Sequence, residues 1–285
     1  MRIINFPGQD NKPDRSKATK EFLRCELLNI RFITSEICSL TFSWHGPMPK
    51  AGQFFMIKPE RTSVFLGRPI SVAAWHESNQ TVEFLIAVIG TGTTEICNML
   101  PGEIAMLTGP LGNSWEKYLS ILNFHKKPIA LVGGGLGIAP LQALVMELPN
   151  INIDFYAGLK TGFLNDDERN GLLGPVAGFN TKEKQQSDNL IIATEDGSEG
   201  YKGFITDFFE PQKYDAVCTC GPLPMMKKVA ALCKKAGVYC FVSMEQYMAC
   251  GVGACLGCTV KTKHENRRCC ADGPIFPAEE LVFNE

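Results

Sequence analysis

The sequence predicts an α/β plus β protein, in which an antiparallel β-barrel precedes a doubly wound parallel sheet and a small cysteine-rich C-terminal domain. Residues 23–110 contain short apolar stretches separated by turn signals, which is typical of an antiparallel barrel. From about residue 125, apolar strands alternate with helical stretches, as in parallel sheets with helical crossovers. Five of the 12 cysteines lie between Cys250 and Cys270, where periodicity is weak.

Composition narrows the classes of function. At roughly 100–200 residues per domain, 285 residues predict two domains with room for a small third. Lys and Arg total 28 against 30 for Asp and Glu, and this balance argues against a nucleic-acid-binding protein. The N-terminal stretch lacks the apolar core of a secretory signal, and no apolar run is long enough to predict a membrane span. We therefore expect a cytoplasmic, reducing setting, in which dispersed cysteines are buried apolar thiols.

The barrel is predicted over 23–123, after a polar extension at 1–22 to which we assign no function. Two segments in it suit phosphate groups. Arg68 in the segment Arg68–Ser71 has a guanidinium that can fork onto phosphate oxygens, although an exposed strand arginine is the simpler interpretation. Gly90–Thr93 precedes an amphipathic stretch and suits a diphosphate, but simple N-capping by Thr93 or Thr94 explains it equally well.

The parallel-sheet domain is predicted over 124–243. Its expected strands are KPIALVGGG, INIDFYAGL, NLIIATEDG, YDAVCTCGP and YCFVSM. The stretch PMMKKVAALCKKAG has apolar residues at helical spacing, and Gly237 is expected to end that helix. Residues 165–188 are polar and irregular, which predicts a loop with one short helix.

Two turns at the carboxyl ends of these strands suit a dinucleotide. The first strand runs into a glycine loop followed by a helix, a setting in which backbone N–H groups bind a pyrophosphate. Its glycines are Gly133, Gly134, Gly135 and Gly137. A tight structural turn is the alternative, because the loop is not a strict G-x-G-x-x-G. Cys220 and Gly221 end the fourth strand and are placed to border a nicotinamide, whereas a buried thiol before a turn is the alternative.

The C-terminal cysteines, in the domain predicted over 244–285, have the spacing of an iron–sulfur site. Cys250, Cys255 and Cys258 form a C-x₄-C-x₂-C pattern, which with a distant fourth cysteine is typical of plant-type [2Fe–2S] clusters. Zinc is the alternative metal, although zinc sites prefer paired knuckles. Spacing does not decide whether Cys269 or Cys270 is the fourth ligand. A segment this short cannot build much core, so other parts of the chain must hold it.

The motifs occur in the order RPIS, GTGT, GPLGN, GGGLGIAP, CGPLPMM and the cysteine cluster, which resembles the ferredoxin–NADP reductase superfamily. The stretch EQYMACGVGACLGCTV followed by CADGPIF resembles the electron-transfer subunits of class B dihydroorotate dehydrogenases, as does TEDGSEGYKG. The resemblance covers residues 23–285.

The resemblance implies a site for FAD and a set of cluster ligands. The implied FAD-binding residues are Arg68, Pro69, Ile70, Ser71, Leu85, Ile86, Ala87, Gly92 and Thr93. Many family members carry a basic residue where this chain has Ala87. The implied [2Fe–2S] ligands are Cys250, Cys255, Cys258 and Cys270, because the C-x-D-G-P context selects Cys270 over its neighbour.

The implied function is an NAD-linked oxidoreductase subunit. It would pass electrons from an FMN-containing dihydroorotate dehydrogenase partner through [2Fe–2S] and FAD to NAD⁺, in pyrimidine biosynthesis and as a heterotetramer. No side chain need act as acid or base, so we name no catalytic residue. NAD is favoured and NADP stays open, since Asp154 lies inside a strand and residues 159–161 offer no Arg for a 2′-phosphate. The alternatives are a diaphorase subunit of a hydrogenase or of a ferredoxin–NADP transhydrogenase, and a redox-sensing or zinc-binding module.

Overall fold

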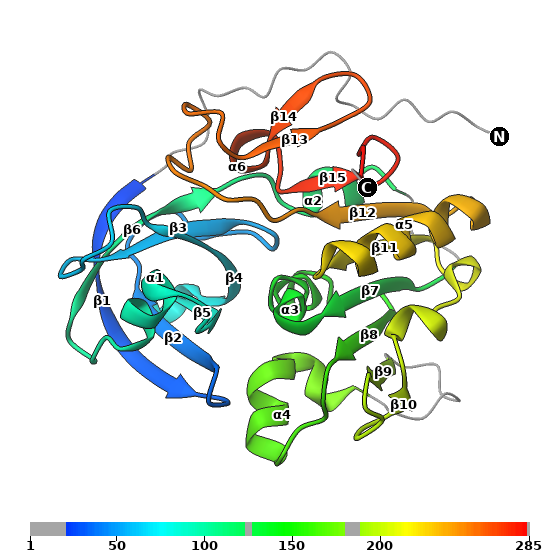
Figure 1. Ribbon diagram of the computed structural model, residues 1–285, viewed down its shortest axis with the longest axis horizontal. Coiled ribbons are helices and arrows are strands. Elements are labelled where there is room, and N and C mark those ends of the chain that lie inside the picture. The colour runs from blue at the N-terminus through cyan, green and yellow to red at the C-terminus, as the bar shows by residue number, and fades with distance from the viewer. Residues whose placement is uncertain (1–20, 123–126, 180–188, 284–285) are drawn as a thin grey trace.

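The described part of the chain begins with a closed six-stranded antiparallel barrel (Figure 1). The structure is a computed structural model that describes residues 21–122, 127–179 and 189–283. Most of the predicted extension lies outside these residues, and β1 begins at Glu21. The barrel strands are β1 (Glu21–Phe32), β2 (Ile37–Ser43), β3 (Phe54–Pro59), β4 (Arg68–His76), β5 (Thr81–Ala87) and β6 (Ile104–Leu111). Their neighbour order is β1-β2-β5-β4-β3-β6.

Aromatic side chains fill the barrel interior. Phe42, Phe55 and Phe84 are fully buried. The ring of Phe84 meets that of Phe55 edge-on at 5.5 Å and that of Phe42 at 6.2 Å. Edge-to-face pairs of this kind contribute about 0.5–1.5 kcal/mol beyond the area that they bury. Because the interior is packed, a ligand of the barrel must bind at its rim or outer surface.

One disulfide joins the barrel wall to a short helix. Cys38 in β2 is bonded to Cys97 at the end of α1 (Thr91–Cys97), and both are buried. The prediction that dispersed cysteines are buried free thiols is confirmed for Cys25, Cys218 and Cys233 but is wrong for this pair. The two residues are 59 positions apart and meet only once the barrel closes, so their spacing carries no signal.

The second part is a seven-stranded sheet in the order β10-β9-β8-β7-β11-β12-β15. Its strands are β7 (Ile129–Gly134), β8 (Ile153–Leu159), β9 (Asn189–Thr194), β10 (Tyr201–Lys202), β11 (Ala216–Cys220), β12 (Tyr239–Ser243) and β15 (Ile275–Pro277). All neighbours are parallel except β12 and β15. The five predicted strands are confirmed, and the chain order reverses between β7 and β11, which makes that junction the topological switch point.

Helices cover both faces of this sheet. The α-helices beyond the barrel are α2 (Glu116–Leu119), α3 (Ile138–Glu147), α4 (Asp166–Leu173), α5 (Leu223–Ala236) and α6 (Cys269–Asp272). The 3₁₀ helices are η1 (Glu77–Asn79), η2 (Gly135–Gly137), η3 (Gly174–Gly178), η4 (Ile205–Asp207) and η5 (Pro211–Lys213). Ile129 and Leu131 of β7 pack in the core beneath α3, while Ala130 and Val132 pack beneath α5. Gly237 ends α5 with φ of 68°, as predicted.

Helix α3 lies between the barrel and the sheet (Figure 1). Ala139 in its first turn packs in one apolar cluster with Ala73 and Leu85 of the barrel. At its last residue, the carboxylate of Glu147 accepts a hydrogen bond of 2.9 Å from the backbone N–H of Ala51. Both ends of α3 therefore fix the sheet relative to the barrel.

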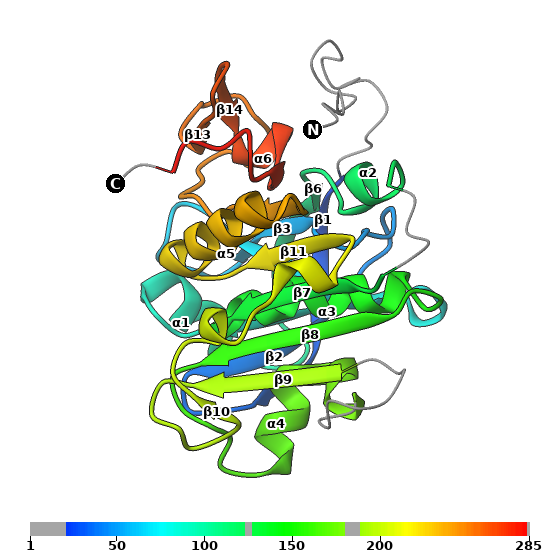
Figure 2. The ribbon, with the colours of Figure 1, turned by 90° about the vertical axis from the view of Figure 1, so that its right-hand side faces the viewer.

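The C-terminal segment is held by the rest of the chain, as its small size requires. Its hairpin, β13 (Thr259–Lys261) and β14 (Asn266–Arg268), lies with α6 at the end of the molecule opposite α4 (Figure 2). Strand β15 then joins the large sheet beside β12. Asn113 binds this segment through side-chain hydrogen bonds to the backbone of Asp272 and Ile275, at 2.9–3.1 Å. Among the described residues, no helix is both long and apolar enough to cross a lipid bilayer.

Candidate cofactor sites

The glycine loop (Gly133–Gly137) and the CGP turn (Cys220–Pro222) meet at the switch point. Strand β7 ends inside the loop, and α3 begins directly after it. A Cβ on Gly137 would lie 2.6 Å from the backbone nitrogen of Gly221, and a Cβ on Gly221 would lie 2.8 Å from the carbonyl oxygen of Gly134. The structure thus brings together all the residues predicted for the dinucleotide site, at the sheet edge where such ligands bind.

The thiol of Cys220 is buried, with 1% of the residue exposed. Burial raises its pKa, and the nearby carboxylate of Glu245 raises it further, while contact with Ser243 lowers it. The thiol is therefore protonated at neutral pH and packs inside the sheet, while the neighbouring backbone of the CGP turn faces the glycine loop.

The sequence alone did not identify the acidic residues that lie near the carboxyl ends of the parallel strands. Asp154 lies near the start of β8, so it is at the amino ends of the strands, whereas the glycine loop is at their carboxyl ends. Its carboxylate accepts hydrogen bonds from Asn189 and Tyr214. Acidic residues do follow the carboxyl end of β9, on the same side of the sheet as the glycine loop. Glu199 accepts a hydrogen bond from the backbone of Phe163 and lies 3.8 Å from Arg169. Their position after a third parallel strand is the signal that could have identified them.

The barrel wall opens between β4 and β5. Cross-strand pairing of these strands ends at Val72 and Phe84, so Arg68–Ser71 and Leu85–Ala87 diverge beyond that pair. The first segment pairs only with β3 on its other side, and the second only with β2. Both therefore have a free backbone edge toward the opening, where N–H and C=O groups are available to a planar heterocycle.

Side chains of the same segments face elsewhere. Ile86 is in the barrel core with 1% of its surface exposed, and Leu85 packs toward α3. The contribution of residues 85–87 to a ligand would therefore come from their backbone.

Arg68 lies against α1. A Cβ on Gly92 would stand 2.5 Å from Nη2 of Arg68, so the guanidinium covers the place where a side chain would be. The N-cap of α1 is Gly90, so neither Thr93 nor Thr94 occupies that position. The hydroxyl of Thr93 instead accepts hydrogen bonds from the backbone N–H groups of Ile89 and Gly90. The sequence-predicted arginine, glycine and threonine thus meet at one place, and a diphosphate there would find a fork of cationic donors.

The loop from residue 60 to 67 is tied to α1 through Glu95. Its carboxylate accepts hydrogen bonds from the hydroxyls of Thr62 and Ser63, and from the backbone of Ser63 at 3.2 Å. These bonds hold the pKa of Glu95 below its usual value. The loop that leads into Arg68 therefore has a fixed position relative to Gly92.

The four predicted cluster ligands come together on the ligand loop (Cys250–Cys258) and at the start of α6. Hydrogen bonds link them as two pairs, because the N–H of Cys255 donates to the sulfur of Cys250 and the N–H of Cys270 to the sulfur of Cys258, each at 3.4 Å. Backbone N–H groups point at the sulfurs, from Gly253 to Cys270 at 3.1 Å and from Cys255 to Cys250 at 3.4 Å. Burial opposes ionisation of Cys250, but such N–H groups lower the pKa of its thiol to about 6.

Cys269 points away from this group. Its thiol is fully buried and donates to the carbonyl oxygen of Met244 at 3.0 Å. Cys270, the next residue, instead accepts the N–H of Gly253. The two residues are neighbours in a helical turn, so their side chains diverge, and Cys270 is the one whose sulfur is hydrogen-bonded to the ligand loop, through the N–H of Gly253, while its own N–H donates to the sulfur of Cys258.

The donor set fits a two-iron cluster. Its four members are all cysteines, and across the described ranges no group of three or more His, Cys, Asp or Glu side chains is close enough to hold a single metal ion. A [2Fe–2S] cluster takes four thiolates, two on each iron, which matches four cysteines linked in two pairs by backbone hydrogen bonds. The loop also needs close approach: φ is +66° at Gly251 and +81° at Gly253, and a Cβ on Gly251 would lie 2.7 Å from Cγ of Met56.

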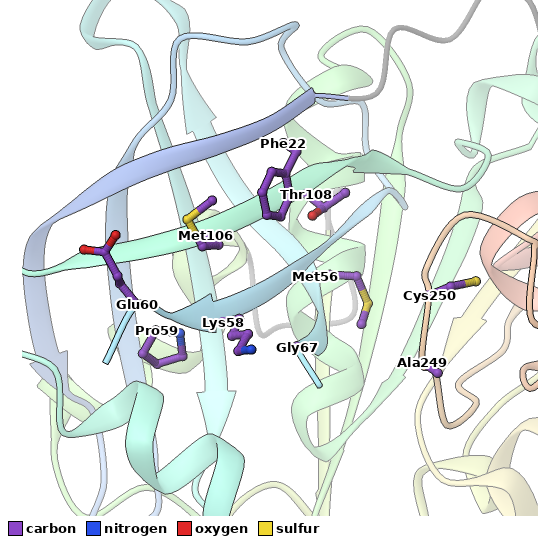
Figure 3. Close-up of a pocket in the computed structure, with 10 residues that line it drawn as sticks. All are labelled: Phe22, Met56, Lys58, Pro59, Glu60, Gly67, Met106, Thr108, Ala249 and Cys250. Carbon is purple, nitrogen blue, oxygen red and sulfur yellow. The ribbon is translucent and has the colours of Figure 1, made fainter. Parts of the chain in front are cut away.

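A cleft of about 340 Å³ separates the ligand loop from the outer wall of the barrel. Figure 3 shows Ala249 and Cys250 on one side and barrel residues on the other. The barrel side is formed by Phe22, Met56, Lys58, Pro59, Glu60, Gly67, Met106 and Thr108. The cysteine site therefore lies directly beside the barrel and is partly open to solvent.

Comparison with known proteins identifies the family. Residues 245–282 match the model of the iron–sulfur cluster binding domain of dihydroorotate dehydrogenase B. The electron transfer subunit of dihydroorotate dehydrogenase B (NAD(+)) from Clostridium perfringens is 41% identical over 243 residues, which cover 84% of this chain and 89% of that protein. The same subunit from Caldanaerobacter subterraneus is 37% identical over 267 residues, 92% of this chain and 98% of that protein.

The chain belongs to the family of dihydroorotate dehydrogenase B electron transfer subunits. The resemblance seen in the sequence is confirmed, and the chain is an oxidoreductase subunit of that family.

Solved structures confirm the predicted fold class. An NADH-dependent reduced ferredoxin–NADP oxidoreductase, described for flavin-based electron bifurcation, has a TM-score of 0.74 and 27% identity and covers 91% of this chain and 90% of its own. A ferredoxin NADP⁺ reductase from Neisseria gonorrhoeae with bound FAD and NADP has a TM-score of 0.60 at 17% identity, covering 76% and 92%, and that likeness concerns the fold alone.

Proposed function

We propose that this chain passes electrons from a dihydroorotate-oxidising, FMN-containing partner subunit through a [2Fe–2S] cluster and FAD to NAD⁺. The observation that carries the proposal is the adjacency of three candidate sites in one molecule. Leu85 beside the barrel opening packs with Ala139, which follows the glycine loop. On the other side of the barrel, Gly251 of the ligand loop packs against Met56 and Leu111. A barrel cofactor would thus lie between the other two.

Each part of the chain has a separate task in this scheme. When bound, the cluster supplies one-electron transfer, and FAD links it to hydride exchange with a nicotinamide. Arg68 neutralises a diphosphate, while the free edges of Arg68–Ser71 and Leu85–Ala87 orient the flavin ring. The glycine loop holds the pyrophosphate of NAD, and Cys220 with Gly221 borders the nicotinamide. No side chain is needed as a general acid or base.

The partner subunit would dock at the ligand loop. Cys255 is exposed, and Leu256 next to it has 61% of its surface exposed. Electron transfer falls off with distance, so the partner must cover the most accessible ligand. Apolar side chains at the surface are the residues that such an interface buries.

We further propose the division into a polar extension (1–22), an FAD domain (23–123), an NAD domain (124–243) and a cluster domain (244–285). The acidic loop after β9, with Glu195, Asp196 and Glu199, supports NAD over NADP, because carboxylates accept from a ribose hydroxyl and repel a 2′-phosphate. Ten of the twelve cysteines are free thiols, four of them proposed as iron ligands, and this majority supports a reducing, cytoplasmic setting against the single buried Cys38–Cys97 disulfide.

Reconstitution with the partner tests the proposal. The chain purified without oxygen is mixed with the FMN-containing catalytic subunit of a close relative, dihydroorotate and NAD⁺, and NADH formation is followed by absorbance. We expect NADH formation only with both subunits present, and Cys220→Ala should slow NADH-dependent flavin reduction. NADH formation by the partner alone, or none by the pair although flavin and cluster are bound, would refute the proposal.

A second function is favoured by one observation, the 27% identity to the ferredoxin–NADP oxidoreductase over 91% of this chain. A subunit of a transhydrogenase would use the same three sites with another partner. The two functions separate in the same experiment, because only the first gives reduction of NAD⁺ by dihydroorotate.

A further inference from the structure

Arg268 connects the two parts of the chain that carry the cysteine sulfurs. It is the last residue of β14, opposite Thr259 in β13, and it directly precedes α6. Cys258 lies just before β13, and Cys270 lies in α6. Arg268 is therefore close to both members of one sulfur pair without being a ligand itself.

The guanidinium is held in place by Asp272. Nε donates to one carboxylate oxygen at 3.0 Å and Nη2 to the other at 3.2 Å, and the backbone N–H of Arg268 also donates to this carboxylate, at 2.8 Å. Only 20% and 14% of the two side chains are exposed. A forked, mostly buried pair is shorter and more directional than a surface ion pair.

The remaining nitrogen reaches the ligand loop. Nη1 of Arg268 donates to the carbonyl oxygen of Gly253 at 3.2 Å, and the N–H of Gly253 donates to the sulfur of Cys270 at 3.1 Å. Gly253 is thus hydrogen-bonded through its N–H to Cys270 in α6 and through its C=O to Arg268, the residue before α6. A Cβ on Gly253 would lie 2.9 Å from the Cβ of Ala271, so the loop already touches α6.

We propose that Arg268, fixed by Asp272, is a positioning residue that clamps Gly253 onto α6 and so sets the reduction potential of the cluster. The proposal rests on the proposed function, since it requires the cluster to be bound. Hydrogen bonds to cluster sulfurs raise the reduction potential, because they stabilise the added negative charge of the reduced state. Loss of the clamp frees Gly253 and weakens its N–H···S bond.

A role of Arg268 as a clamp and a role as a positive charge alone predict different reduction potentials for the same variants. If Arg268 acts only as a positive charge, Arg268→Lys keeps the wild-type potential, and Asp272→Asn raises the potential by removing a negative charge. If Arg268 acts as a clamp, both variants lower the potential, because a lysine cannot fork onto Asp272 while reaching Gly253, and an asparagine cannot hold the guanidinium.

Arg267 supplies the matched control. It is the neighbour in the same strand, has 19% of its side chain exposed, and pairs with Glu265 and Glu280 and not with the ligand loop. Arg267→Lys preserves the charge and weakens two ion pairs of the neighbouring arginine, to Glu265 and Glu280.

The test is a redox titration of the full chain, monitored by EPR, together with the rate of iron loss to a chelator. For Arg268→Lys and Asp272→Asn we expect a more negative midpoint, a changed EPR line shape and on the order of 10-fold faster iron loss, with Arg267→Lys unchanged. Wild-type midpoints and iron loss in both variants, or a higher midpoint in Asp272→Asn, overturn the clamp. A wild-type chain without a [2Fe–2S] signal would instead refute the proposed function.

Discussion

The backbones of Gly137 and Cys220 touch at the switch point of the sheet, since a Cβ on Gly137 would lie 2.5 Å from the carbonyl carbon of Cys220. Gly137 ends η2, which directly follows β7, and Cys220 is the last residue of the neighbouring strand β11; the two are 83 positions apart in the chain. Their contact sets the distance between the pyrophosphate end and the nicotinamide end of the proposed NAD site.

Gly137→Ala should push these two turns apart. The φ of Gly137 is −61°, so alanine fits the backbone conformation and the added methyl group is strained only by its clash with Cys220. Overpacking of this kind costs about 1–3 kcal/mol, which urea unfolding measures, and the affinity for NADH should fall. Gly178→Ala, at a glycine with open space around it, is the control. Equal NADH affinity in both variants would show that the contact does not shape the site.

Gly92→Ala should release FAD. The new methyl group displaces the guanidinium of Arg68, and with it the donors for a diphosphate. We expect a lower ratio of flavin to protein after gel filtration, measured by absorbance. Gly90→Ala is matched to it, because Gly90 is two residues away with extended backbone and nothing within 4 Å. Full flavin content in Gly92→Ala would exclude Arg68 from FAD binding.

Cys270→Ser and Cys269→Ser should behave oppositely. Replacing Cys270 removes one of the four grouped sulfurs and should abolish or strongly weaken the EPR signal and the iron content. Replacing Cys269 should leave both intact, because its thiol only donates to Met244 and a serine hydroxyl can do the same. Loss of iron in Cys269→Ser alone would reverse the ligand assignment.

Glu147 should make stability depend on pH. Burial raises the pKa of its carboxyl group, while the hydrogen bond from Ala51 lowers it, and the net direction is upward. The fold therefore binds the proton more tightly than the unfolded chain, so the contribution is present at low pH and is lost as pH rises through the folded-state pKa. Urea unfolding at pH values rising from 4.5, the ordinary pKa of a glutamate, should show wild type losing stability relative to Glu147→Gln, which keeps the acceptor for Ala51. Parallel pH profiles of the two proteins would contradict this.

Much of the fold was predictable from local patterns in the sequence. Strands β7, β8, β9, β11 and β12 and helix α5 were predictable because apolar spacing and a terminal glycine are read over a few neighbouring residues. The four grouped cysteines were predictable for a similar reason, since a short loop around a cluster needs fixed spacing and interleaved glycines.

Long-range pairings were not predictable. Asn113 holds the C-terminal segment across 159–162 positions, and β15 adds to the sheet from that segment, yet the motifs GPLGN and CADGPIF that contain these residues do not indicate that they meet. The opening between β4 and β5 depends on where a cross-strand register ends, at Val72 and Phe84. Such features arise only after distant strands have paired.

Stepwise titration of the anaerobically purified chain with NADH, followed by absorbance and EPR, tests the central claim most directly. If cluster, flavin and nicotinamide sites are linked in one chain, NADH bleaches the flavin absorbance and then produces the EPR signal of a reduced [2Fe–2S] cluster. A flavin that bleaches while an intact cluster gives no signal, or a colourless chain that binds zinc, would contradict the account.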